Sequence, residues 1–319
     1  MEPGGTLRRH SGTIRILSTF AAAVLITAGV AIAQAPTAGQ TPGGAQTAGN
    51  DPTQPVRTKT IHLKHVLVIG QTMGSTHDSV SAAMYTVYKM GHDSGLWDTV
   101  MRTDTQLVTK KKLDKNAKNL DYFDCIVFAN TTGELTMDDS QKQDMMSFIK
   151  IDGKGFVGIH AALDTNHNWP EYGEMIGGWF DTHPWGIFDA PIINEDPSFP
   201  AVRHFPAAFT KYDEIYQPMA WSRSKVHVLL SLDPSKLLYE SNGVPNSRVH
   251  RTDHDFAVAW DKMYGNGRVF YSTLGHTEEA WENPDIQKMY FEAIKWALGM
   301  TEGSTAPHER PTESPTAAK

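Results

Sequence analysis

The alternation of short apolar runs with helix-periodic segments is the sequence feature that most constrains how this chain folds. Four apolar runs lie in its first half, at residues 65–70, 98–103, 123–129 and 155–159. Continuous runs of this kind are typical of strands buried on both faces of a sheet. Residues 80–91 and 136–151 instead repeat apolar side chains at helical spacing, and Thr136 is the expected N-cap of the second segment. The alternation predicts an α/β fold with a mostly parallel sheet and helices on both faces.

The second half of the domain has a less regular pattern. Further strands are expected at residues 188–194, 226–232, 257–260 and 268–274. Residues 264–267, read Tyr-Gly-Asn-Gly, predict a hairpin between the last two of these strands, with Asn-Gly as its turn. A final helix is expected over residues 284–298, with proline at its first position.

The two ends of the chain differ in composition from its centre. Residues 1–33 combine three arginines with an apolar run that ends in Ala-Ile-Ala, which predicts a cleaved signal peptide. The alternative is an uncleaved segment that anchors the chain in a membrane. Residues 34–59 and 302–319 are rich in small and polar residues and are expected to be disordered. Residues 60–301 remain as one large domain, in a protein expected to be exported to the periplasm or the extracellular space.

Composition and missing motifs exclude several classes of function. The formal net charge is −7, with no dense basic patch, so nucleic-acid binding is not expected. A single cysteine, Cys125, excludes an internal disulfide and a paired-cysteine metal site, and its apolar run predicts a buried thiol. The chain lacks the serine-hydrolase elbow, the glycine-rich nucleotide loops and the HExxH zinc motif.

Histidines follow three of the predicted strands directly. His77 lies in the loop after the first strand, His160 comes directly after residues 155–159, and His276 follows the hairpin. A fourth, His183, lies in a loop rich in glycine and aromatic residues. Because the carboxyl ends of parallel strands share one edge of the sheet, these side chains are expected to converge there. Imidazoles so placed act as acids or bases, or as ligands for a divalent metal with nearby carboxylates.

Four ordered motifs resemble the ThuA-like (trehalose-utilisation) family: residues 155–162, 177–184, 213–216 and 265–276. The resemblance implies a flavodoxin-like fold similar to class I glutamine amidotransferases. In that comparison His160 stands where an amidotransferase keeps its cysteine, and His276 resembles the later histidine. Thiolate attack on glutamine is therefore not expected, since Cys125 lies inside a strand. Residues 75–78 resemble the family's Arg-His-Asp stretch, although Thr76 replaces the basic residue.

The resemblance also implies sugar metabolism, associated with 3-keto disaccharides or glycosides. The leading hypothesis is a lyase, hydrolase or isomerase that uses histidine acid–base or metal-assisted chemistry. The alternatives are a non-catalytic carbohydrate-binding module and a metal-dependent hydrolase of another substrate class. The expected partner is a small carbohydrate, and the only expected cofactor is a divalent metal ion. We assign catalytic roles to His77, Asp78, His160 and His276, substrate contacts to Asp164, Trp179, Asp213, Glu214, Tyr216 and Glu278, and metal ligation to His77, His160 and His183.

Overall fold

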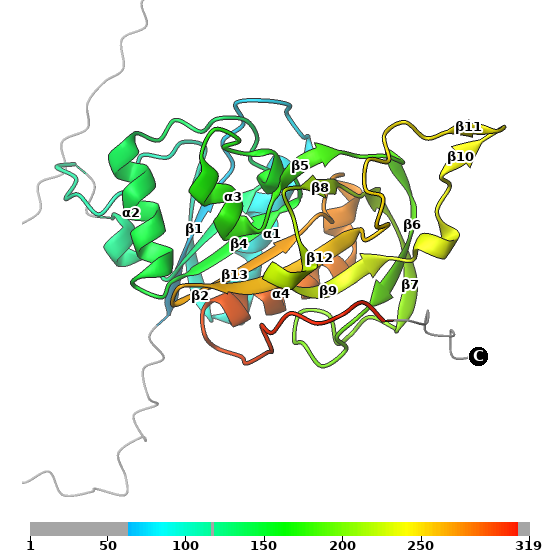
Figure 1. The fold of residues 1–319 in the computed structure, drawn as a ribbon. Coiled ribbons are helices and arrows are strands. Elements are labelled where there is room, and N and C mark those ends of the chain that lie inside the picture. Colours follow the sequence, from blue (N-terminus) through cyan, green and yellow to red (C-terminus); the bar gives the residue numbers. More distant parts are fainter. Residues whose placement is uncertain (1–62, 116–117, 312–319) are drawn as a thin grey trace, which may run out of the picture. The chain divides into compact units, whose positions relative to one another are not determined.

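A nine-stranded sheet forms the centre of the domain in a computed structural model, which describes residues 63–115 and 118–311 (Figure 1). The strand order is β2-β1-β3-β4-β13-β12-β9-β6-β7. These strands are β1 (Lys64–Ile69), β2 (Trp97–Arg102), β3 (Cys125–Ala129), β4 (Gly155–Ile159), β6 (Ile187–Asn194), β7 (Ala208–Glu214), β9 (His227–Leu232), β12 (Ala257–Tyr264) and β13 (Gly267–Ser272).

The first five strands of this order run parallel to one another. Their arrangement is the flavodoxin-like order, with a switch in chain direction between β1 and β3. The α/β fold with a largely parallel sheet is therefore confirmed. Ligands in such folds bind beyond the carboxyl ends of the strands, close to that switch point.

Four α-helices cover the two faces of the sheet: α1 (Ser79–Ser94), α2 (Asp139–Lys150), α3 (Pro170–Ile176) and α4 (Pro284–Ala297). Alternate side chains of β1 point to opposite faces, so that Val66 and Val68 pack with α1 and α4, whereas Leu67 and Ile69 pack with α2 and α3. Strand side chains alternate with period two, which divides the core into two layers. Cys125 lies in one of these layers and is buried, as expected.

The antiparallel strands β12, β9, β6 and β7 extend the parallel sheet on one side. The hairpin between β12 and β13 is present, but its turn differs from the one expected. Tyr264 pairs with Gly267, so Gly265 and Asn266 form the two-residue turn. Gly265 takes the left-handed φ of +60° that this turn demands at its first central position.

The N-cap of α2 also differs from the expectation. Asp138, rather than Thr136, caps this helix, because its side chain accepts from Gln141 N while the Gln141 side chain accepts from Asp138 N. This reciprocal pair is a capping box. The Thr136 hydroxyl donates to the side chain of Gln71 instead, which ties the loop before α2 to the end of β1.

Several short elements escaped the sequence analysis because they carry no sustained periodicity. Strand β7, helix α3 and the small paired strands β5 (Trp179–Thr182) with β8 (Gln217–Met219) and β10 (Glu240–Ser241) with β11 (Val244–Pro245) belong to this group. Within residues 302–311, for which disorder is expected, His308 Nε2 donates to Val228 O at 2.8 Å and Arg310 donates to His254 O. Individual hydrogen bonds hold this segment, and composition does not reveal them.

No helix within residues 63–115 and 118–311 is long and apolar enough to cross a membrane. The predicted signal peptide at residues 1–33 and linker at residues 34–59 lie outside the described residues.

Candidate functional site

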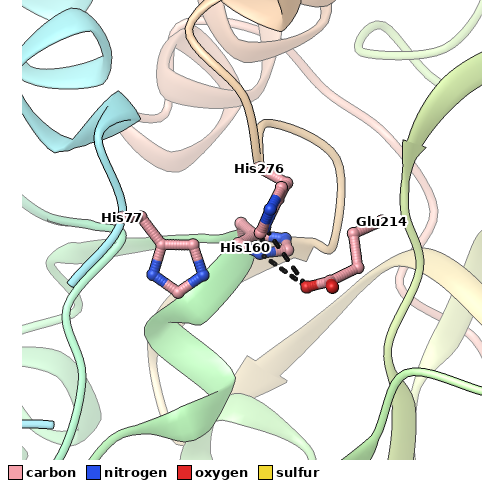
Figure 2. A group of neighbouring side chains, drawn as sticks. All are labelled: His77, His160, Glu214 and His276. Carbon is pink, nitrogen blue, oxygen red and sulfur yellow. Dashed lines mark hydrogen bonds and ion pairs between the residues drawn. The ribbon is translucent and has the colours of Figure 1, made fainter. Parts of the chain in front are cut away.

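Three histidines and one glutamate meet at the carboxyl ends of the parallel strands (Figure 2). His77 lies between β1 and α1, His160 follows β4, and His276 follows β13. Glu214 ends β7 on the far side of the sheet, and the chain then crosses to the strand ends, where Tyr216 N donates to Thr273 Oγ1 at 2.9 Å. Each of the four residues offers a ligand atom, and these atoms all lie within 4.8 Å of one another. We call these four residues the His/Glu cluster.

His160 occupies a sharp turn directly after β4. Its φ is +43°, a left-handed backbone value that residues other than glycine adopt only with strain. The ring is completely buried, and its Nδ1 lies 2.5 Å from the carbonyl oxygen of Thr273. A carbonyl only accepts, so Nδ1 carries the proton and Nε2 presents its lone pair to His276 Nδ1, 2.9 Å away.

Glu214 links the histidines of the cluster. Its Oε2 lies 3.2 Å from His276 Nδ1 and 3.6 Å from His160 Nε2, while its Oε1 lies 3.5 Å from His183 Nδ1. Burial acts to lower the pKa of His276, but the hydrogen bond and charge of Glu214 outweigh it and raise the pKa. For Glu214 burial acts to raise the pKa, and His276 outweighs this and lowers it.

The other two imidazoles of the cluster favour the neutral form. Complete burial holds the pKa of His160 well below its usual value, and the charges of His77 and His276 act in the same direction. Burial and then the neighbouring His276 lower the pKa of His77. The Tyr216 hydroxyl lies 3.4 Å from His77 Nε2, and burial raises the pKa of this phenol well above its usual value.

Asp213 supports the cluster from behind rather than contacting a substrate. Its carboxylate accepts from Gly275 N at 2.8 Å, His276 N at 3.0 Å and Glu214 N at 2.9 Å. The side chain is 1% exposed, and burial raises its pKa to about 6. Backbone donors from two loops surround its carboxylate, and Asp213 does not line the cavity beside the cluster, so the substrate contact expected for it stays a prediction.

A cavity of about 540 Å³ opens beside the cluster. Eight of the residues assigned from the sequence line it: His77, Asp78, Asp164, His183, Glu214, Tyr216, His276 and Glu278. His160 does not line the cavity, because its ring lies beneath those of its neighbours and both of its nitrogens are engaged. The ring of His160 therefore lies behind the lining of the cavity, with its Nε2 facing His276 and Glu214.

Trp179, like His160 and Asp213, is an assigned residue that does not line the cavity. Its ring packs against Gly173 of α3, where even a Cβ atom would approach it to 2.1 Å. Phe180, the next residue of β5, faces the opposite way and lines the cavity. Successive side chains of a strand point to opposite faces, so only one of Trp179 and Phe180 can face the cavity. The sequence Gly-Gly-Trp-Phe does not show which of the two it is.

The sequence analysis missed Asn130, which supports the loop of His276. It follows β3 at a φ of +50°, and its Nδ2 donates to Gly275 O at 3.1 Å and to Ser79 Oγ. Ser79 Oγ in turn donates to His276 O at 2.7 Å. The histidines were selected because they follow the carboxyl ends of parallel strands. The same rule, applied to β3, selects Asn130.

Known proteins resemble this chain in both sequence and fold. A profile of the ThuA family, described as trehalose utilisation, matches residues 65–297. A ThuA-like protein from Bacteroides uniformis ATCC 8492 has a similar structure, with a TM-score of 0.60, 22% identity, and coverage of 76% of this chain and 95% of that one. A second, from Parabacteroides merdae ATCC 43184, has a TM-score of 0.55, 17% identity, and coverage of 80% and 95%.

A weaker match, with a TM-score of 0.42 and 15% identity, is to PurLQS from Thermotoga maritima, over 74% of this chain and 99% of that one. No curated protein sequence matches the chain. The two ThuA-like structures show the fold, whereas the profile is matched over well over half of the 319 residues and identifies the family. The chain is therefore a member of the ThuA family.

Proposed function

We propose that the protein is an enzyme that acts on a 3-keto disaccharide or glycoside in the cavity beside the His/Glu cluster. One observation carries the proposal: three imidazoles and a carboxylate from four distant segments converge beside one polar cavity, which three of the four residues line. Such convergence, with a strained backbone at His160, is typical of catalytic sites. The ThuA family's link to trehalose utilisation supports a sugar as the substrate.

The chemistry that fits this site is removal of a proton from the carbon next to the keto group. We assign the base to His183, which lines the cavity, has a side chain 37% exposed, and faces Glu214 Oε1 through Nδ1. Its position resembles a base oriented by a carboxylate. The His/Glu cluster polarises the keto oxygen and stabilises the negative charge that develops on it.

Two outcomes follow once that proton has moved to His183. In an elimination, the electron pair of the broken C–H bond forms a C=C bond, and the glycosidic C–O bond breaks. The departing oxygen then takes a proton from a cavity acid such as Asp164, whose pKa burial raises. In an isomerisation, His183 instead returns the proton to the former carbonyl carbon, and the hydroxyl proton on the adjacent carbon passes to the former keto oxygen.

Incubation of the full chain with a panel of 3-keto glycosides tests the proposal. We expect product from wild type, and a loss of about 100-fold or more in kcat for His183→Ala and His276→Ala with unchanged circular dichroism. Sugar binding without product, equal in all three proteins, would instead identify a carbohydrate-binding module. Turnover by both variants at the wild-type rate would overturn the assignment of the site.

We also propose that the protein acts outside the cytoplasm, where it meets glycosides directly. The basic and apolar character of residues 1–33 supports export. Cell fractionation and N-terminal sequencing test this, with a mature start near Gln34 as the expected result. Recovery of the intact chain from the cytoplasm would contradict export.

A further inference from the structure

We infer that His77, His160, Glu214 and His276 hold a divalent transition-metal ion of the zinc class. The inference about binding stands on the His/Glu cluster alone, while the ion's task in polarising a keto oxygen rests on the proposed function. Figure 2 shows the three imidazoles and the carboxylate facing one another across a small space.

The spacing of the donor atoms matches that of a metal centre. His276 Nδ1, His160 Nε2 and Glu214 Oε2 form a triangle with sides of 2.9, 3.2 and 3.6 Å. Four ligands at zinc–nitrogen and zinc–oxygen distances of about 2.0–2.1 Å would lie about 3.3–3.4 Å apart in a tetrahedron. His77 completes the set within the 4.8 Å limit and lines the cavity, so the ion would be reachable from that side.

The His/Glu cluster contains more acceptor lone pairs than N–H groups that could donate hydrogen bonds to them. The Thr273 carbonyl fixes the proton of His160 on Nδ1, so Nε2 is an acceptor, and the Glu214 carboxylate is an acceptor as well. The single N–H that His276 Nδ1 can offer lies between these two acceptors, which are 3.6 Å apart. A cation placed among the three atoms satisfies all of them at once, which one hydrogen bond does not.

The groups around the cluster are those that usually hold metal ligands in place. A ligating histidine commonly donates its other ring nitrogen to a carbonyl or carboxylate, as His160 does to Thr273. Asp213 fixes the backbone of His276, and the free oxygen of Glu214 faces His183. Three imidazole nitrogens with one carboxylate favour zinc, iron, cobalt or nickel over magnesium and calcium, which prefer oxygen ligands.

Direct metal binding by the purified full chain tests the inference without any substrate. After treatment with chelator, the protein is titrated with Zn²⁺, Co²⁺ or Mg²⁺ by calorimetry, and bound Co²⁺ is followed by its visible absorption. We expect one Zn²⁺ or Co²⁺ per chain and no Mg²⁺. His276→Ala and Glu214→Gln should weaken Zn²⁺ binding by about 100-fold or more, whereas loss of an outer partner costs about 10–100-fold.

Two matched variants separate this ligand set from other histidines. His167 pairs with Asp164 at 3.1 Å outside the cluster, and His167→Ala should leave the affinity unchanged. His183→Ala removes an outer partner of Glu214 and should weaken binding by about 10-fold, less than the loss of a ligand. Loss of binding in His183→Ala with full retention in His276→Ala would overturn the ligand set.

Two further results would overturn the metal assignment itself. They are the absence of stoichiometric Zn²⁺ or Co²⁺ binding in wild type, and a preference for Mg²⁺. Failure of the proposed function is distinguishable from both. Stoichiometric binding that depends on His276 but accompanies no sugar turnover would keep the metal centre and remove the proposed activity. Turnover that survives chelator in a protein without bound metal would keep the proposed activity and remove the metal centre.

Discussion

Two regions of this protein bury histidines beside carboxylates, and they differ in what the imidazole nitrogens face. In the His/Glu cluster, lone pairs converge on a shared space next to a cavity. In the antiparallel half of the sheet, His227 of β9 lies 4% exposed between two carboxylates. Its Nδ1 is 2.8 Å from Asp261 Oδ2 and its Nε2 is 3.4 Å from Asp196 Oδ2, so each nitrogen has its own partner.

The comparison shows that burial of a histidine beside a carboxylate does not by itself indicate function. Both ring nitrogens of His227 face a carboxylate, and the rings of His227 and His308 lie edge to face with centroids 5.2 Å apart. The His/Glu cluster is under-supplied with hydrogens and lies on a strained turn at His160. Convergence, strain and an adjoining cavity therefore distinguish a candidate site from a structural pair.

The largest expected effect separates the two regions by activity. His276→Ala should lower kcat on a 3-keto glycoside by about 10³-fold, equivalent to about 4 kcal/mol, because it removes a cluster member that lines the cavity. His227→Ala should leave kcat close to wild type when it is measured well below the melting temperature. Steady-state kinetics on folded protein provide the measurement. Equal losses in both variants would break the distinction.

His227→Ala, which should leave kcat close to wild type, should instead lower the free energy of unfolding. His227→Ala leaves Asp261, which is fully buried, without its main partner, and should lower the free energy of unfolding by about 3 kcal/mol. Urea denaturation followed by circular dichroism measures this loss. A loss below about 1 kcal/mol would show that water readily solvates the pair.

The same pair predicts how stability depends on pH. Burial raises the pKa of Asp261 to about 7, and for His227 burial is outweighed by Asp261, which raises its pKa. Both groups therefore hold protons more tightly in the folded protein. Their contribution to stability is full at low pH and is lost as pH rises through the folded pKa values, by about 1–2 kcal/mol between about pH 5 and pH 8. Unfolding measured across this range should show a smaller slope in Asp261→Asn.

Asp124→Asn is the control with the opposite sign. Burial acts to raise the pKa of Asp124, but Lys154 and the backbone N–H of His65 outweigh it and lower the pKa. Its contribution is present above the unfolded value of about 4 and is lost as pH falls below it. This variant should therefore lower the free energy of unfolding at neutral pH and change its slope against pH on the acid side alone. A changed slope above about pH 6 would contradict the assignment.

The smallest expected effect concerns the strained turn of the His/Glu cluster. His160→Gly and His160→Ala remove the same imidazole, but only alanine keeps a Cβ at a φ of +43°. We expect His160→Gly to be more stable than His160→Ala by about 1 kcal/mol, because glycine adopts left-handed φ without strain. Urea denaturation of the two variants measures the difference. Equal stabilities would show that the turn stores no strain.

Much of the fold and part of the site were predictable from local sequence. Apolar runs such as residues 65–70 and 155–159 are visible because a strand buried on both faces needs an unbroken set of apolar side chains. The histidines at the strand ends followed from the sheet rule. The phase of β5 was not predictable, so Trp179 was assigned to the cavity in place of Phe180. The role of Asp213 was also hidden, because a buried carboxylate and a solvated one look alike in sequence.

The sequence by itself determined the parallel sheet, the positions of His77, His160 and His276 at strand ends, and the family to which the chain belongs. Only the tertiary structure decided that Glu214 joins them and that His160 is buried beneath its partners. The physical reason is the distance along the chain over which each interaction acts. Periodicity and turn preferences act over a few residues, whereas the contact between Glu214 and the histidines depends on β7 lying at the far edge of the sheet and on the path of the chain after it.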